Sequence, residues 1–136
     1  MNGRPACVVD ASALLAYLRG EPGAEKVRAA LGLGAAISAA NWAEVLSKFV
    51  DLGQNPDDVP ARLIREGILG SALLVWPLDE ALCRPIARLR RQTRFAGLSL
   101  ADRACLALGL TLRLPVLTTD RVWRKLKIGV QVRCIR

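Results

Sequence analysis

Four acidic residues in this sequence have neighbours that suit an active site. Two of them stand at the end of a short, mostly apolar run. The other two come three positions after a residue of a type that caps helices. They are Asp10, Asp120, Glu44 and Asp102. Carboxylates brought close together repel one another, and a divalent cation such as Mg2+ or Mn2+ relieves this repulsion because it prefers oxygen ligands. A cation held in this way lowers the pKa of a bound water and polarises a phosphodiester, so the acids predict metal-assisted hydrolysis.

Glu44 and Asp102 also have a purely structural interpretation. Glu44 comes three residues after Asn41, and Asp102 comes three residues after Ser99. This spacing is that of a capping box, and an acid in the first turn of a helix is also favoured by the helix dipole. The spacing alone therefore leaves both roles open.

The composition narrows the chemistry further. The 136 residues include no histidine, which excludes histidine general acid–base catalysis, nucleophiles activated by histidine, and histidine-ligated zinc. Lysine and arginine number 20 against 12 aspartates and glutamates, giving a net charge of +8. A surface of this charge suits a polyanionic partner, either a nucleic acid or an acidic protein.

Short apolar runs alternate with helical patterns along the chain. We expect strands at residues 6–9, 35–38, 72–76, 115–117 and 130–133, and helices at 11–19, 21–31, 40–52, 56–69, 79–93, 99–112 and 122–126. Short strands that are mostly apolar throughout and alternate with helices are typical of a parallel sheet covered on both faces. In such a fold, ligands bind beyond the carboxyl ends of the strands, which is where Asp10 and Asp120 lie. Helices that follow strands begin at the same edge, so the two helical acids are expected there as well.

The length suits a single domain spanning residues 1–136. No apolar run approaches the roughly 20 residues needed to cross a bilayer, and the N-terminus shows no signal peptide. We therefore expect a cytoplasmic protein with no membrane partner.

Four segments together resemble the PIN-domain family, and within it the VapC toxins of toxin–antitoxin pairs. They are VVDASAL at 8–14, NWAEV at 41–45, LSLADR at 98–103 and LTTD at 117–120, and the resemblance spans nearly the whole chain. It implies a PIN-like three-layer α/β/α fold with a short, mainly parallel central sheet. It also implies an endoribonuclease that depends on Mg2+ or Mn2+, is inhibited by a cognate antitoxin protein and forms a homodimer.

Carried over residue by residue, the resemblance gives each of the four acids a role. Asp10 and Asp102 coordinate the metal directly, and Asp120 does so directly or through water. Glu44 binds a second metal ion or orients the attacking water. The four therefore act as one catalytic and metal-binding group.

Hydroxyl and basic side chains complete the predicted site. Two hydroxyls match positions that support the acids in this family, namely Ser12 and Thr118. Basic residues are weaker candidates for contacts to RNA phosphates, because a solvated surface explains them as well. They are Arg88, Arg91, Arg103 and Arg121.

The three tryptophans are expected to anchor the core or an interface rather than to stack on bases. They are Trp42, Trp76 and Trp123. Only Trp123 has basic neighbours, which makes it the one candidate for stacking on a nucleic-acid base.

Two other functions share parts of this pattern. A PIN-like module that binds RNA or protein without cutting has the same fold, although the complete set of four acids argues against it. A phosphatase-like enzyme with an acidic Mg2+ pocket is the other alternative. It fits less well, because haloacid-dehalogenase-like phosphatases need a second Asp two residues after the first, where this chain has Ser12.

Overall fold

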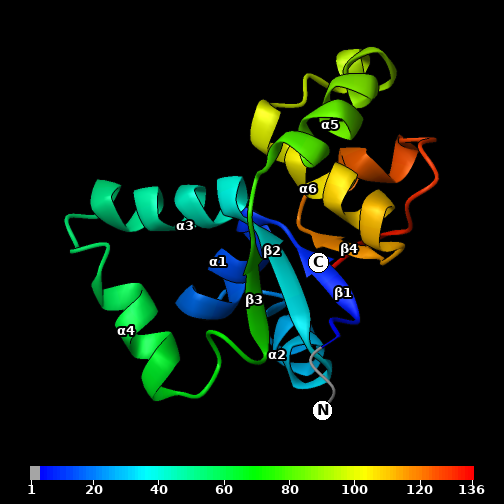
Figure 1. The fold of residues 1–136 in the computed structure, drawn as a ribbon. Coiled ribbons are helices and arrows are strands. Elements are labelled where there is room, and N and C mark those ends of the chain that lie inside the picture. The colour runs from blue at the N-terminus through cyan, green and yellow to red at the C-terminus, as the bar shows by residue number, and fades with distance from the viewer. Residues whose placement is uncertain (1–3) are drawn as a thin grey trace.

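The computed structural model describes residues 4–136, so the first three residues of the expected domain lie outside it. Five strands form one sheet in the order β3-β2-β1-β4-β5, and every neighbouring pair is parallel. The strands are β1 (Cys7–Val9), β2 (Ala35–Ser38), β3 (Leu73–Trp76), β4 (Val116–Thr118) and β5 (Val132–Cys134). The chain builds outward from β1 to β3 and then returns to the other side of β1 (Figure 1). The crevice between the carboxyl ends of β1 and β4 is therefore the position where such sheets bind ligands.

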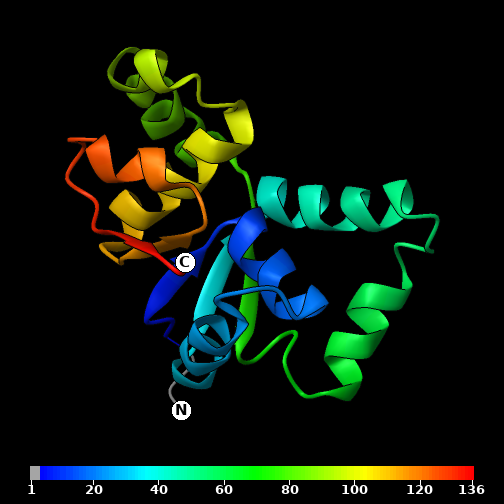
Figure 2. The same ribbon diagram turned by 180° about the vertical axis from the view of Figure 1, so that it is seen from behind.

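Helices cover both faces of this sheet, which confirms the predicted three-layer arrangement (Figure 1 and Figure 2). One layer contains α1 (Ala11–Arg19), α2 (Ala24–Leu33), α3 (Ala39–Asp51) and α4 (Asp58–Arg65). The other contains α5 (Glu80–Thr93), α6 (Leu100–Leu112) and the 3-10 turns η1 (Arg94–Ala96) and η2 (Arg121–Lys125). Both views show α3 and α4 extending outward to one side of the sheet. Within the described chain, no helix has the length and apolar character needed to cross a membrane.

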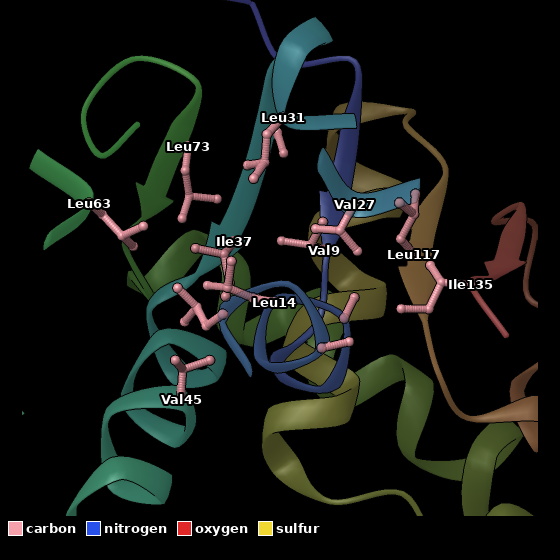
Figure 3. Packing of buried hydrophobic residues seen from close by; sticks show 14 of the residues in the cluster. Val9, Leu14, Val27, Leu31, Ile37, Val45, Leu63, Leu73, Leu117 and Ile135 are labelled. Atoms are coloured by element: carbon pink, nitrogen blue, oxygen red, sulfur yellow. The ribbon is translucent and has the colours of Figure 1, made fainter. Parts of the chain in front are cut away.

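Successive residues of the buried strands point to opposite faces of the sheet and enter two separate cores. Val9, Ile37 and Leu117 belong to the core beneath α1–α4, where Figure 3 shows them side by side. Val8 and Val116 belong to the core beneath α5 and α6. Burial on both faces explains why these strands carry apolar residues without alternation.

Gly109 allows α6 to lie directly on the sheet. A Cβ at this position would come within 2.6 Å of Val116 Cγ2 and 3.0 Å of Val130 Cγ2, so a larger residue requires these two valines to move. This contact sets the depth of the helix whose first turn carries Asp102.

Glycines shift two helix boundaries from their predicted places. α2 begins at Ala24 rather than at residue 21, because Gly23 precedes it with a left-handed φ of 94°. α4 ends at Arg65 rather than at residue 69, because the chain turns at Gly67 with a φ of 72°. Two further elements also differ from the prediction. The strand predicted at 130–133 forms later, as β5 (Val132–Cys134), and the helix predicted at 122–126 is the 3-10 turn η2 (Arg121–Lys125).

Candidate active site

A cleft of about 730 Å³ opens at the carboxyl edge of the sheet. Its walls come from the start of α1, one face of α3, the start of α6 and the loop that follows β4. All four acids expected at this edge line it, namely Asp10, Glu44, Asp102 and Asp120. The parallel sheet brings them together because strands end, and the following helices begin, at the same edge.

Asp10 is the most enclosed of the four acids, with 5% of its surface exposed. It caps α1, and its Oδ1 accepts hydrogen bonds from Ala13 N at 2.8 Å and Ser12 Oγ at 2.7 Å. Its Oδ2 accepts one from Thr118 Oγ1 at 2.6 Å. Burial raises the pKa of Asp10 to about 6 although these three bonds lower it, and the charge of Asp102 adds to the rise. Asp10 is therefore held in a fixed orientation but makes no salt bridge within residues 4–136.

Ser12 and Thr118 connect the two chain segments that carry Asp10 and Asp120. Ser12 Oγ donates to Asp10 and accepts a hydrogen bond from the Thr119 backbone N–H at 3.0 Å. Thr118 Oγ1 donates to Asp10 and accepts one from the Asp120 backbone N–H at 3.0 Å. Each hydroxyl therefore donates its proton to the Asp10 carboxylate and accepts a backbone N–H from the loop after β4.

Asp102 stabilises its own helix while lining the cleft. Its backbone N–H donates to Ser99 Oγ at 3.1 Å, and its Oδ2 accepts from the Ser99 N–H at 3.0 Å. The capping box read from the sequence is therefore present here. No hydrogen bond to Oδ1 is found within residues 4–136, so the cap holds the carboxylate by one oxygen.

Glu44 does not form the capping box that its spacing suggested. α3 is capped by Ser38, whose Oγ accepts from the Asn41 N–H at 3.1 Å, because β2 runs into the helix without an intervening turn. Asn41 is buried, and its Nδ2 donates to Glu44 Oε1 at 3.2 Å. Burial raises the pKa of Glu44, the Asn41 amide opposes this rise, and the charge of Asp102 adds to it. Glu44 therefore lies in the second turn, and helix capping does not account for it.

Asp120 is the N-cap of η2, and its Oδ1 accepts a hydrogen bond from the Val122 N–H at 3.0 Å. Its side chain is exposed at the cleft, unlike that of Asp10. It is therefore less constrained by its surroundings than Asp10.

None of the four acids makes a salt bridge within residues 4–136, although the chain contains 20 basic residues. Among the described residues there is also no preassembled group of three or more potential metal ligands. The donor set nevertheless fits Mg2+ or Mn2+, because these ions prefer oxygen ligands and Mg2+ commonly keeps several waters beside one or two carboxylates. The mutual repulsion of Asp102 with Asp10 and Glu44 is of the kind that a cation relieves.

Two charged residues of the cleft escaped the sequence analysis. Lys48 and Asp51 follow Glu44 by four and seven positions on α3, and both line the cleft. Residues with this spacing share one face of a helix. Extending the helical spacing forward from Glu44 would have identified them.

The arginines considered for RNA contacts are dispersed. Arg103 is buried, donates from Nη1 to Ile86 O at 3.1 Å, and is not among the described residues that line the cleft. Arg88 and Arg91 are exposed on α5 in the other layer, and Arg121 is exposed at the start of η2. The cleft therefore gathers the acids but not this group of arginines.

The tryptophans are part of the cores, as expected. Trp123 is 1% exposed and packs in the core beneath α5 and α6, so the suggestion that it stacks on a base is wrong. Trp42 and Trp76 are partly buried against the two cores.

The sequence model of the PIN domain matches residues 7–129, and the chain belongs to the PIN-domain family. No curated protein matches it in sequence. A toxin–antitoxin complex from Klebsiella pneumoniae shares the fold with a TM-score of 0.73 and 19% identity, over 96% of this chain and 98% of that chain. The sarcin-ricin-loop-cleaving toxin VapC20 from Mycobacterium tuberculosis has a TM-score of 0.70 and 14% identity, over 92% and 98%. FitAcB from Neisseria gonorrhoeae has a TM-score of 0.66 and 21% identity, over 93% and 95%.

Proposed function

We propose that this chain is a metal-dependent endoribonuclease that acts in the cytoplasm as the toxin of a toxin–antitoxin pair. The observation that carries the proposal is the environment of Asp10. This carboxylate is buried, its pKa is raised to about 6, and it shares a cleft with four further acids that have no salt bridge among the described residues. Membership of the PIN-domain family and the net charge of +8 agree with a nuclease that acts on RNA.

Asp10 and Asp102 are the residues that would hold Mg2+ or Mn2+, with Asp120 contributing directly or through water. When bound, the cation lowers the pKa of a water and polarises the phosphodiester. Ser12, Thr118 and the Ala13 N–H keep Asp10 oriented and favour its charged form. Fixed ligand orientation of this kind is what hydrogen bonds behind a metal site provide.

Glu44 either contributes to a second cation site or orients the attacking water. Its Oε1 is held by Asn41, and no hydrogen bond to Oε2 is found in the described part of the chain. A raised pKa makes its carboxylate a stronger acceptor for a proton from that water.

Exposed basic side chains outside the cleft would attract RNA to the protein. Arg88, Arg91 and Arg121 are exposed and supply positive charge without occupying the acidic cleft. Such charges attract the phosphate backbone whatever the base sequence.

An antitoxin protein and a second copy of the chain are the remaining proposed partners. Several large apolar side chains are exposed on the first helical layer, among them Leu33, Val50 and Ile64, and a partner protein could cover them. Solved relatives that share the fold are toxin–antitoxin complexes, which supports an antitoxin. Light scattering of the chain alone and with the product of an adjacent small gene tests both partners. A strict monomer that binds no such product would contradict this part of the proposal.

Cleavage of a labelled RNA during Mg2+ or Mn2+ titration, with EDTA as the control, tests the activity. We expect Asp10→Asn and Asp102→Asn to abolish cleavage while far-UV circular dichroism stays unchanged. Asp58→Asn, an exposed acid on α4 outside the cleft, is the matched control and should cleave normally. Near-normal cleavage by either cleft variant, or cleavage in EDTA, would refute the proposal. Stabilisation by the cation without cleavage would favour the binding module instead.

A further inference from the structure

A small pocket of about 210 Å³ lies where α5, η1 and the start of α6 meet. It is separate from the acidic cleft and shares no lining residue with it. Its lining is basic, and within residues 4–136 it includes no acid. The lining residues are Arg90, Thr93, Arg94, Gly97, Leu98 and Arg103.

Arg103 is an uncompensated charge in this pocket. It is 7% exposed, its Nη1 donates to Ile86 O at 3.1 Å, and its Nε is fully buried with no hydrogen-bond partner. It makes no salt bridge within the described chain. A buried charge without a counter-ion is strongly unfavourable, and a bound anion relieves that cost. The buried guanidinium without a counter-ion in the described residues therefore indicates an anion site.

Arg90 and Arg94 favour a phosphate group over a small uncharged molecule as the ligand of this pocket. Both are exposed and neither makes a salt bridge in the described residues. With Arg103 they bring three guanidinium groups to one small pocket. The guanidinium fork matches phosphate geometry and remains charged at all relevant pH values.

Phe95 favours a nucleotide over other anions as the ligand. Its side chain is 69% exposed and directly follows Arg94 in η1. Among the described aromatic residues it alone is exposed, since the others are buried or half-buried. Phe95 is not itself a lining residue of the pocket, but it lies on the same 3-10 turn as the lining residue Arg94. Exposed aromatic rings on a basic surface bind single-stranded RNA, with a base on the ring and phosphates on the cations.

We propose that this pocket and Phe95 form a subsite for single-stranded RNA, in which Arg90, Arg94 and Arg103 hold a backbone phosphate and Phe95 stacks on a base. Adjacent residues of a helix point about 100° apart. The first turn of α6 accordingly presents Asp102 to the cleft and Arg103 to the pocket. The RNA as ligand rests on the proposed ribonuclease function, whereas the phosphate site itself does not.

The phosphate site is tested by thermal unfolding with inorganic phosphate in EDTA, where no cation-dependent cleavage occurs. Arg90→Gln/Arg94→Gln is the test variant, because both residues are exposed and Arg103 itself supports the core. Arg28→Gln/Arg65→Gln removes two exposed arginines from the opposite helical layer and is the matched control. We expect phosphate to raise the Tm of the wild type and the control but not of the test variant. An equal rise in all three would overturn the site.

The RNA assignment is tested by the binding of a fluorescent single-stranded RNA to the wild-type chain in EDTA. Phe95→Ala and Phe95→Leu should each weaken binding about tenfold, and Phe95→Trp should restore it, since stacking needs an aromatic ring. Arg90→Gln/Arg94→Gln should reduce the salt slope by about 0.7, the value for one phosphate on a single strand.

The outcomes separate this subsite from the proposed catalytic function. RNA binding that depends on Phe95, in a protein that never cleaves RNA, supports the subsite and contradicts only the nuclease. Phosphate stabilisation that needs Arg90 and Arg94, combined with RNA binding that ignores Phe95, overturns the RNA assignment. If the wild-type chain cleaves RNA but none of these variants changes RNA or phosphate binding, the subsite is overturned and the nuclease function is not.

Discussion

Thr118 Oγ1 lies 2.6 Å from Asp10 Oδ2, although 108 residues separate the two in the sequence. The same oxygen accepts the Asp120 N–H at 3.0 Å, so one buried hydroxyl fixes two acids of the cleft. The contact exists because β1 and β4 are parallel neighbours whose ends coincide, with Val9 opposite Leu117.

Thr118→Val should impair RNA cleavage more than it impairs folding. A buried hydrogen bond to a charged group contributes about 1.5–3 kcal/mol, and its loss also releases the loop that carries Asp120. The hydroxyl lowers the pKa of Asp10, so its removal should shift the acid limb of the pH–rate profile to higher pH. Thr118→Ser retains the hydroxyl and should restore both the rate and the profile. A Val variant with an unchanged profile would contradict this role.

Because of Asp10, the metal-free protein should be less stable at neutral pH than in acidic solution near pH 4. The folded protein binds the Asp10 proton up to about pH 6, whereas the ordinary pKa of an aspartate is 3.8. Between these values the folded state binds more protons than the unfolded state, so stability falls as pH rises and stays lower above pH 6. The difference of about two pKa units corresponds to roughly 3 kcal/mol.

Asp10→Asn isolates this effect because it removes the titrating group. Urea unfolding in EDTA should show the variant gaining stability relative to the wild type by roughly 2–2.5 kcal/mol between pH 4 and pH 7. Added Mg2+ or Mn2+ should stabilise the wild type at pH 7 much more than the variant. A difference between the two proteins that stays constant with pH would show that Asp10 titrates normally.

Gly109→Ala and Gly32→Ala should change stability in opposite directions. Both glycines lie inside helices, where alanine is intrinsically better by about 1 kcal/mol. At Gly109 the new methyl group meets Val116 at 2.6 Å, and overpacking of this kind costs about 1–3 kcal/mol. At Gly32 nothing lies within 4 Å, so the intrinsic gain should appear in full. Denaturant midpoints measure both, and a stabilised Gly109→Ala would mean that α6 can move off the sheet.

Arg88→Glu/Arg91→Glu tests whether the exposed face of α5 contacts RNA. If each residue neutralises one phosphate, the salt slope of single-stranded RNA binding should fall by about 1.4. Arg28→Glu/Arg65→Glu changes the net charge equally on the other helical layer and is the control. Equal effects of the two pairs would mean that α5 acts only through the overall charge of the protein.

Local sequence patterns were sufficient to predict the elements and the edge at which the acids meet. The short apolar runs required burial on both faces, which indicated a parallel sheet, and this placed Asp10 and Asp120 at its carboxyl edge. The Ser99–Asp102 capping box was also readable, because its two partners lie within one helical turn. These features depend on spacing along the chain and on hydrophobicity, both of which a sequence contains directly.

Tertiary structure decided the features that depend on the pairing of distant segments. The alignment of β1 with β4 placed Thr118 on Asp10, and the packing of α6 against α5 turned Arg103 away from the cleft toward Ile86. Burial of Trp123 and exposure of Phe95 likewise follow from which surfaces the neighbouring elements cover. The sequence by itself determined which acids share an edge, because the ends of the strands and the starts of the helices follow from local patterns. Only the packed structure determined how those acids are held and where the basic residues point, because contacts between distant residues depend on register and packing depth.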